Sequence, residues 1–139
     1  PTDLLFDLQQ KFTDKSVQIA TCVHKIIDAN SISNPNRVKV VLNKRHEALY
    51  FSRSVIPHQN DRICPAEYFQ HIGVYAFRWK TLQEIVKLKV GKLELQESLE
   101  QLRWLENGYP IHCIKTEYNG FGIDTEQDLK KAREILGEV

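Results

Sequence analysis

The stretch Gln70-His71-Ile72-Gly73-Val74-Tyr75-Ala76-Phe77 decides how the rest of this sequence is interpreted. It is apolar, β-branched and aromatic, and polar or charged residues bound it, which predicts a buried β-strand. Because side chains alternate across a strand, one face should carry His71, Gly73, Tyr75 and Phe77. The other face should carry Ile72, Val74 and Ala76. Four residues of strand would place His71 and Tyr75 roughly 13 Å apart unless the strand bends them together.

Two polar side chains and a glycine are unusual in so apolar a strand. Glycine packs nothing and weakens a strand, unless a ligand or another backbone comes close to it. One interpretation is a core strand whose His71 and Tyr75 tips are satisfied by neighbouring main chain. The other is the wall of a site for a polar ligand. The strand alone leaves both interpretations open.

Length, charge and cysteine content limit the class of protein. The chain has 139 residues, enough for one domain with its own core, and 19 basic residues nearly balance 18 acidic ones. This balance gives no reason to expect nucleic acid or a membrane surface as a partner. No apolar run approaches the roughly 20 residues needed to cross a bilayer. Three scattered cysteines, Cys22, Cys64 and Cys113, favour reduced thiols and a cytoplasmic location over disulfides or a metal cluster.

The remaining pattern alternates helices and strands. Helices are predicted from Leu4 to Phe12, around residues 82–88, over 93–106 and from residue 125 onward. Strands are predicted over 17–23, 70–77 and 110–117, with a hairpin formed by 37–42 and 48–52 and a long loop over 53–68. Such alternation predicts an α/β domain with a mixed β-sheet flanked by helices, the hairpin being its antiparallel part.

Two of these segments carry further candidate residues. On the 93–106 helix one side is the core stripe Leu95, Leu99, Leu102 and Leu105. The opposite side carries Glu97, Glu100, Gln101 and Trp104. A solvated face explains the three polar residues, but not the large aromatic. Asp124 directly precedes the last helix, in a loop where ligands of α/β sheets gather, and is either a helix cap or a metal ligand.

Five segments of the chain, taken in order, resemble one family, the 3-deoxy-manno-octulosonate (Kdo) cytidylyltransferases, also called CMP-Kdo synthetases. The matching segments are Asn34-Pro35-Asn36-x-Val38-Lys39-Val40-Val41-Leu42, Ala48-Leu49-Tyr50-Phe51-Ser52-Arg53-Ser54-x-Ile56-Pro57, His71-Ile72-Gly73-Val74-Tyr75-Ala76-Phe77-Arg78, Glu97-Ser98-Leu99-Glu100-Gln101-Leu102-Arg103 and Gly122-Ile123-Asp124-Thr125-x-x-Asp128-Leu129. Each is a weak signal alone, but together they cover nearly the whole chain.

The resemblance implies a fold and a reaction. The fold is the Rossmann-like fold of nucleotide-diphospho-sugar transferases. The reaction is attack of the anomeric hydroxyl of Kdo on the α-phosphate of CTP, which gives CMP-Kdo and pyrophosphate for lipopolysaccharide biosynthesis, with Mg²⁺ as cofactor. It further implies a cytoplasmic homodimer.

The resemblance also implies roles for individual residues. Arg53 would meet the carboxylate of the sugar acid, and His71 and Tyr75 would contact its hydroxyls. Glu100 and Gln101 would hold further hydroxyls, and Asp124 would be a Mg²⁺ ligand.

Relatives begin with a Gly-, Arg- and Lys-containing loop for the CTP phosphates and carry a Gly-Asp-x-Pro motif, neither of which occurs here. We therefore expect residues 1–139 to be a single α/β domain, the C-terminal sugar-binding and dimerisation part of an incomplete fold, and to be inactive alone. Two alternatives stay open at this point. One is CTP-dependent activation of another acidic sugar of the sialic-acid type, and the other is a non-catalytic dimerisation module.

Overall fold

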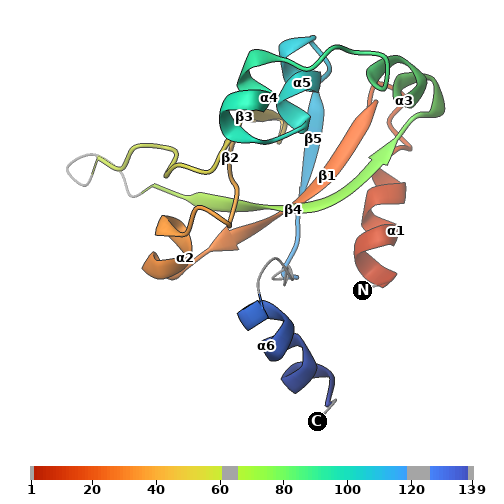
Figure 1. Cartoon of the computed structure of the whole chain (residues 1–139). Helices are drawn as coiled ribbons and strands as arrows, with labels where there is room; N and C mark the ends of the chain where they lie inside the picture. Colours follow the sequence, from red (N-terminus) through yellow and green to blue (C-terminus); the bar gives the residue numbers. More distant parts are fainter. Residues whose placement is uncertain (1, 61–65, 119–125, 138–139) are drawn as a thin grey trace.

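The protein is built on a five-stranded mixed sheet with the strand order β3-β2-β4-β1-β5 (Figure 1). The computed structural model describes residues 2–60, 66–118 and 126–137. Its strands are β1 (Ile19–Ile26), β2 (Lys39–Leu42), β3 (Ala48–Ser52), β4 (Tyr68–Phe77) and β5 (Ile111–Lys115). Its helices are α1 (Thr2–Lys11), α2 (Ala29–Ser33), α3 (Trp79–Ile85), α4 (Lys92–Glu97), α5 (Gln101–Glu106) and α6 (Glu126–Leu136).

The pairing of the strands makes the sheet mixed, as the sequence predicts. β1 runs parallel to β5, whereas the β1–β4, β2–β3 and β2–β4 pairs are antiparallel. The predicted hairpin is the β2–β3 pair. β4 is the longest of the described strands. It pairs with β1 along its length and with β2 at Phe69 and Gln70. The stretch Gln70 to Phe77 therefore lies in an interior strand of the sheet.

The two faces of the sheet bury separate clusters, as the alternation along 70–77 predicts. On one face, Ile72 packs with Val74 and Ala76 against Leu4 and Leu8 of α1. On the other face, the helices α3 and α5 and the α4–α5 junction cover a larger core. Its buried members are Ile19, Val23, Val40, Ala48, Phe51, Phe69, Ile85, Leu99, Leu102, Trp104, Ile111 and Cys113. Each large apolar side chain buried here contributes about 1.5–3 kcal/mol to the free energy of unfolding.

Tyr75 and Phe77 project from β4 into this second face and pack against the larger core. The helical layers seen in Figure 1 thus place α4 and α5 over the face of β4 that carries the candidate residues, and α1 over the opposite face.

The cysteines agree with the expectation of reduced thiols where the structure describes them. Cys22 and Cys113 are free and buried, and burial raises their pKa values to about 11 and about 12. Both thiols are therefore protonated near neutral pH, and they pack as small apolar groups. Cys64 lies outside the described residues.

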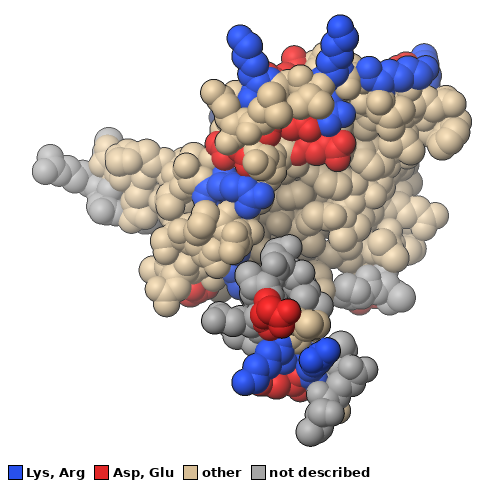
Figure 2. Space-filling view, viewed as in Figure 1, with Lys and Arg blue, Asp and Glu red and all other residues tan. Residues whose placement is uncertain are grey.

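The described helices are short, and the face seen in Figure 2 carries charges of both signs. Within residues 2–60, 66–118 and 126–137 no helix is long and apolar enough to span one. Figure 2 shows acidic and basic side chains interleaved over α4 and α5, with most of the rest of this face uncharged. The face in view therefore lacks the single-sign field that draws proteins to anionic partners.

Candidate functional site

His71 and Tyr75 come together because β4 bulges against β1. In the register Thr21 lies opposite Tyr75 while the next residue, Cys22, lies opposite Ile72, so the two residues between Ile72 and Tyr75 have no partner on β1. A bulge bends the strand and increases its twist. The ring centroids of His71 and Tyr75 are consequently 5.2 Å apart, and the two side chains share one face as predicted.

Gly73 lies in this bulge and is exposed. A Cβ atom built on it would meet no described atom within 4 Å. The fold itself therefore leaves space at this position, and the approach of a ligand over Gly73 stays a prediction.

Tyr75 lies among aromatic side chains, and its hydroxyl has no hydrogen-bond partner among the described residues. Its ring lies 5.1 Å from that of Trp104 and 5.8 Å from that of Phe77, measured between centroids. The hydroxyl is buried, and no described residue offers it a hydrogen bond. Burial raises the pKa of Tyr75, and the negative charge of Glu100 adds to the rise, so the phenol stays protonated. A buried hydroxyl without a partner is costly, and a site that a ligand completes is one explanation.

Trp104 is only 6% exposed, because it covers both Tyr75 and Phe77 with its ring edge. The sequence indicated that this aromatic residue had something to cover, and the structure identifies it as the candidate strand. Trp104 is thereby an internal wall of the site.

Glu100 and Gln101 lie at the start of α5, the helix that carries Trp104. The Glu100 side chain is 65% exposed and lies 3.6 Å from the Arg103 guanidinium. Gln101 is buried, with 6% of its surface exposed, and precedes Trp104 by one helical turn. The Glu100 side chain is thus accessible from solvent, whereas Gln101 is enclosed by the fold.

The single helix predicted over residues 93–106 is wrong, because the chain forms two short helices with a sharp junction. Ser98, between α4 and α5, has φ 54° and ψ 48°, the left-handed conformation that ends a helix. The ion pair between Glu94 of α4 and Arg103 of α5 holds the two helices together at 2.5 Å. As a result Leu95, predicted in the core stripe, is 70% exposed, while Leu99 and Leu102 are buried.

The prediction of a solvated face is also wrong for Glu97. Its carboxylate accepts hydrogen bonds from the Ser52 hydroxyl at 2.7 Å and from the Arg53 main-chain N–H at 3.0 Å. The Tyr50 hydroxyl donates to it at 3.5 Å. Glu97 therefore joins α4 to the end of β3, a role that no local sequence pattern signals.

Arg53 binds main-chain carbonyls at the junction. Its Nε donates to the Glu97 carbonyl at 2.9 Å, and its terminal nitrogens donate to Pro35 at 3.3 Å and Ser98 at 3.5 Å. The Glu97 and Ser98 carbonyls are among those that the end of α4 leaves without intrahelical partners. Each terminal nitrogen carries a second N–H, so the fork can still donate to a carboxylate from outside.

Lys39 is the charged residue that sequence reasoning missed. It is fully buried in β2, and its ammonium donates to the Arg53 carbonyl at 2.6 Å and to the Asn34 carbonyl at 2.9 Å. Burial lowers its pKa, and the nearby Arg53 charge lowers it further, while Glu97 opposes the shift. The signal in the sequence was a lysine flanked by valines within a buried strand.

Among the residues predicted for the site, the structure places the rings of His71 and Tyr75 side by side, and the charge of Glu100 acts on Tyr75. Gln101 lies one helical turn before Trp104, which packs on Tyr75, and Arg53 lies at the α4–α5 junction. Asp124 lies outside the described residues. Within the described residues no group of three or more His, Cys, Asp or Glu side chains could hold a metal ion.

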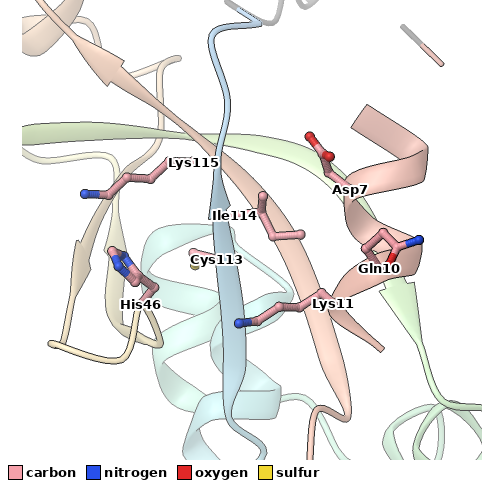
Figure 3. Close-up of a pocket in the computed structure, with 7 residues that line it drawn as sticks. All are labelled: Asp7, Gln10, Lys11, His46, Cys113, Ile114 and Lys115. Atoms are coloured by element: carbon pink, nitrogen blue, oxygen red, sulfur yellow. The ribbon is translucent and has the colours of Figure 1, made fainter. Parts of the chain in front are cut away.

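A pocket of about 550 Å³ lies elsewhere, between α1, β5 and the turn before β3 (Figure 3). Its lining residues are Asp7, Gln10, Lys11, His46, Cys113, Ile114 and Lys115. None of the predicted site residues is among them, so the pocket gives no support to that assignment.

Comparisons with known proteins show the family to which the chain belongs. A family model described as cytidylyltransferase matches residues 1–116. A 3-deoxy-manno-octulosonate cytidylyltransferase of Flavobacterium johnsoniae is 42% identical over 139 residues, covering 100% of this chain and 57% of the relative. One of Bacteroides thetaiotaomicron is 50% identical over 134 residues, covering 90% of this chain and 53% of the relative.

A solved structure of CMP:2-keto-3-deoxy-manno-octonic acid synthetase complexed with CTP superposes with a TM-score of 0.88 at 38% identity. The match covers 99% of this chain and 56% of that one. The mixed sheet and its helices therefore define part of a nucleotide-diphospho-sugar transferase fold. The chain belongs to the cytidylyltransferase family. It spans about half the length of the curated relatives it matches.

Proposed function

We propose that the protein containing this chain transfers CMP from CTP to the anomeric hydroxyl of Kdo, giving CMP-Kdo and pyrophosphate for lipopolysaccharide biosynthesis. The observation that carries the proposal is the likeness, over 99% of this chain, to a CMP-Kdo synthetase solved with CTP. The geometry adds the buried Tyr75 hydroxyl, which has no hydrogen-bond partner among the described residues and suits a ligand rich in hydroxyl groups.

In this proposal the described residues bind and orient the sugar acid. His71 and Tyr75 meet its hydroxyls from β4, and Glu100 and Gln101 do so from α5. Arg53 offers the remaining N–H groups of its planar fork to the carboxylate. Support comes from the 5.2 Å separation of the His71 and Tyr75 rings, and from the influence of the Glu100 charge on Tyr75.

We propose Mg²⁺ as the cofactor, with Asp124 as a ligand. When bound, the cation would orient the triphosphate and offset its negative charge. A carboxylate oxygen is the ligand type that Mg²⁺ prefers. Within the described residues no cluster could hold the ion, so from this chain the proposal rests on Asp124 alone and needs ligands from CTP or from elsewhere in the protein.

We further propose that the protein is a cytoplasmic homodimer and that residues 1–139 supply its sugar-binding and dimerisation part. Trp79 and Val86 at the two ends of α3 are 71% and 65% exposed, and such apolar residues suit an interface. Trp104 is buried within the chain and is not available for such a contact. Sedimentation of the complete protein, with Trp79→Ser as the variant, tests the dimer: unchanged assembly would remove α3 from the interface.

The reaction is tested by steady-state kinetics of the complete protein with CTP and a panel of acidic sugars. We expect Kdo to be used and sialic acids to be refused. Glu100→Ala should raise the KM for Kdo about tenfold or more, because it removes a charged hydrogen-bond acceptor, and should leave the KM for CTP nearly unchanged.

Glu106→Ala is the matched control, since Glu106 is an exposed carboxylate at the far end of the same helix. Equal losses for both substrates in Glu100→Ala would reject its assignment to the sugar. For the cofactor, Asp124→Asn should raise the Mg²⁺ concentration needed for half-maximal rate. Unchanged activity at limiting Mg²⁺ would reject Asp124 as a ligand.

A further inference from the structure

Thr21 is a fully buried residue of β1 whose hydroxyl faces the candidate strand. Its Oγ1 lies 2.8 Å from the Val74 carbonyl oxygen, 3.1 Å from the Ile72 carbonyl oxygen and 3.0 Å from His71 Nε2. The two carbonyls belong to the residues on either side of Gly73, so Thr21 closes the β4 bulge. The same oxygen therefore fixes both the backbone of the bulge and the ring of His71.

The single hydrogen of the Thr21 hydroxyl determines which groups donate in the hydrogen bonds around Oγ1. A hydroxyl has one hydrogen, and a carbonyl oxygen can only accept. A separation of 2.8 Å between Oγ1 and the Val74 oxygen is an ordinary O–H···O hydrogen bond, so the Thr21 hydrogen is directed at the carbonyls. Toward His71 the Thr21 oxygen can then only accept, and Nε2 must carry the hydrogen.

The tautomer of His71 follows from this assignment. In a neutral imidazole one nitrogen carries hydrogen and the other holds a lone pair. The hydrogen-bond partner of one nitrogen therefore determines which nitrogen carries the hydrogen. Burial lowers the pKa of His71 to about 4, so the ring is neutral at pH 7. Tyr75 and Phe51 flank it, with ring centroids at 5.2 and 5.1 Å. Among the described residues no side chain or main-chain group donates to Nδ1.

We propose that Thr21 is a positioning residue that holds His71 with hydrogen on Nε2, so that Nδ1 accepts a hydrogen bond from a sugar hydroxyl. This inference rests on the proposed function for its ligand, but not for the tautomer. It makes His71 a hydrogen-bond acceptor, whereas Arg53 is a donor, so the two residues recognise different parts of a hydroxylated acid. A ligand that presents only hydrogen-bond acceptors to His71 Nδ1 would bind poorly.

The tautomer is measured by long-range ¹H–¹⁵N NMR of the ¹⁵N-labelled complete protein at pH 7, with the His71 signals assigned by their loss in His71→Gln. We expect a protonated, pyrrole-type Nε2 and an unprotonated, pyridine-type Nδ1. Thr21→Ser keeps the hydroxyl and should keep this pattern. Thr21→Val should mix the two tautomers. A parent protein with hydrogen on Nδ1 overturns the inference, and this result does not depend on whether Thr21→Val folds.

Kinetics separate this inference from the proposed function. Thr21→Val should raise the KM for Kdo about tenfold, the loss of roughly one hydrogen bond, with Thr21→Ser close to the parent. Thr81→Val is the control, since Thr81 is also a buried threonine and lies in α3. The expected tautomer together with normal Kdo kinetics in His71→Gln overturns the role of Nδ1 toward the sugar. A Kdo defect in His71→Gln with the opposite tautomer overturns the role of Thr21 and leaves the proposed function standing.

Discussion

Arg53 and Glu97 hold each other through reciprocal hydrogen bonds across 44 residues of sequence. Arg53 Nε donates to the Glu97 carbonyl at 2.9 Å, and the Arg53 main-chain N–H donates to the Glu97 carboxylate at 3.0 Å. The buried Lys39 ammonium adds a 2.6 Å hydrogen bond to the Arg53 carbonyl. The end of β3 and the end of α4 are thereby fixed to one another, and the fixed junction determines where Glu100 and Gln101 begin α5.

Replacing Arg53 by lysine should weaken this junction although the charge is kept. A lysine ammonium cannot bridge the carbonyls of Glu97, Ser98 and Pro35 as the planar guanidinium does. We expect the free energy of unfolding of Arg53→Lys to fall by about 1–3 kcal/mol, measured by urea denaturation. The control is Arg45→Lys, because the Arg45 side chain is 79% exposed and should be nearly neutral when changed. Equal stability of the two variants would contradict the role of Arg53 at the junction.

Because the backbone at Ser98 is left-handed, two substitutions there should change the free energy of unfolding in opposite directions. Glycine adopts this conformation without a Cβ clash, so Ser98→Gly should raise the free energy of unfolding by about 0.5–1 kcal/mol. Ser98→Val should lower it by about 1–2 kcal/mol, because a β-branched residue fits this region poorly. Thermal unfolding measures both. Ser33→Gly, in helical α2, should instead destabilise, and a destabilised Ser98→Gly would argue against the helix break.

Removing the Tyr75 hydroxyl should stabilise the free protein and impair its sugar site. The hydroxyl is buried without a described partner, so Tyr75→Phe should raise the free energy of unfolding by about 1 kcal/mol. The same variant should raise the KM for Kdo, if a ligand supplies the missing partner. Tyr109→Phe is the comparison, because the Tyr109 hydroxyl donates to Glu84 at 3.2 Å and its removal should bring no gain. A loss of stability in Tyr75→Phe would mean that the hydroxyl is already satisfied.

His71 should make the fold sensitive to mild acid. Its folded pKa of about 4 lies below the ordinary value of 6.5, so the unfolded chain binds the proton first as the pH falls. The contribution of His71 to the free energy of unfolding is therefore constant above about pH 6.5. It declines from there toward pH 4, by about 3 kcal/mol at most. Urea titrations at pH 7, 5.5 and 4.5 should show a shallower decline for His71→Gln than for the parent. Parallel declines would show that His71 titrates normally.

Local patterns in the sequence determined much of this fold. The alternation around Gly73 predicted the two faces of β4. The apolar residues from Leu4 to Phe12 predicted the helix α1, which buries Leu4 and Leu8, although Leu5 is exposed. The β2–β3 hairpin followed from two β-rich runs around a polar turn. These features depend on neighbours within a few residues, so they are visible in the sequence. The family resemblance likewise gave the candidate site residues, and the structure places the His71 ring beside the Tyr75 ring on one face of β4.

The tertiary structure alone decided the break at Ser98, the burial of Lys39 and the partners of Glu97. Helical periodicity favoured one helix over residues 93–106, but hydrogen bonds from Arg53 and the ion pair between Glu94 and Arg103 stabilise two. The Thr21 contact that assigns the His71 tautomer likewise joins residues 50 positions apart. Such interactions leave no periodic trace, because their energy arises only when distant strands and helices pack together. The sequence by itself therefore defined the elements and the candidate residues, and the packing of those elements defined their chemistry.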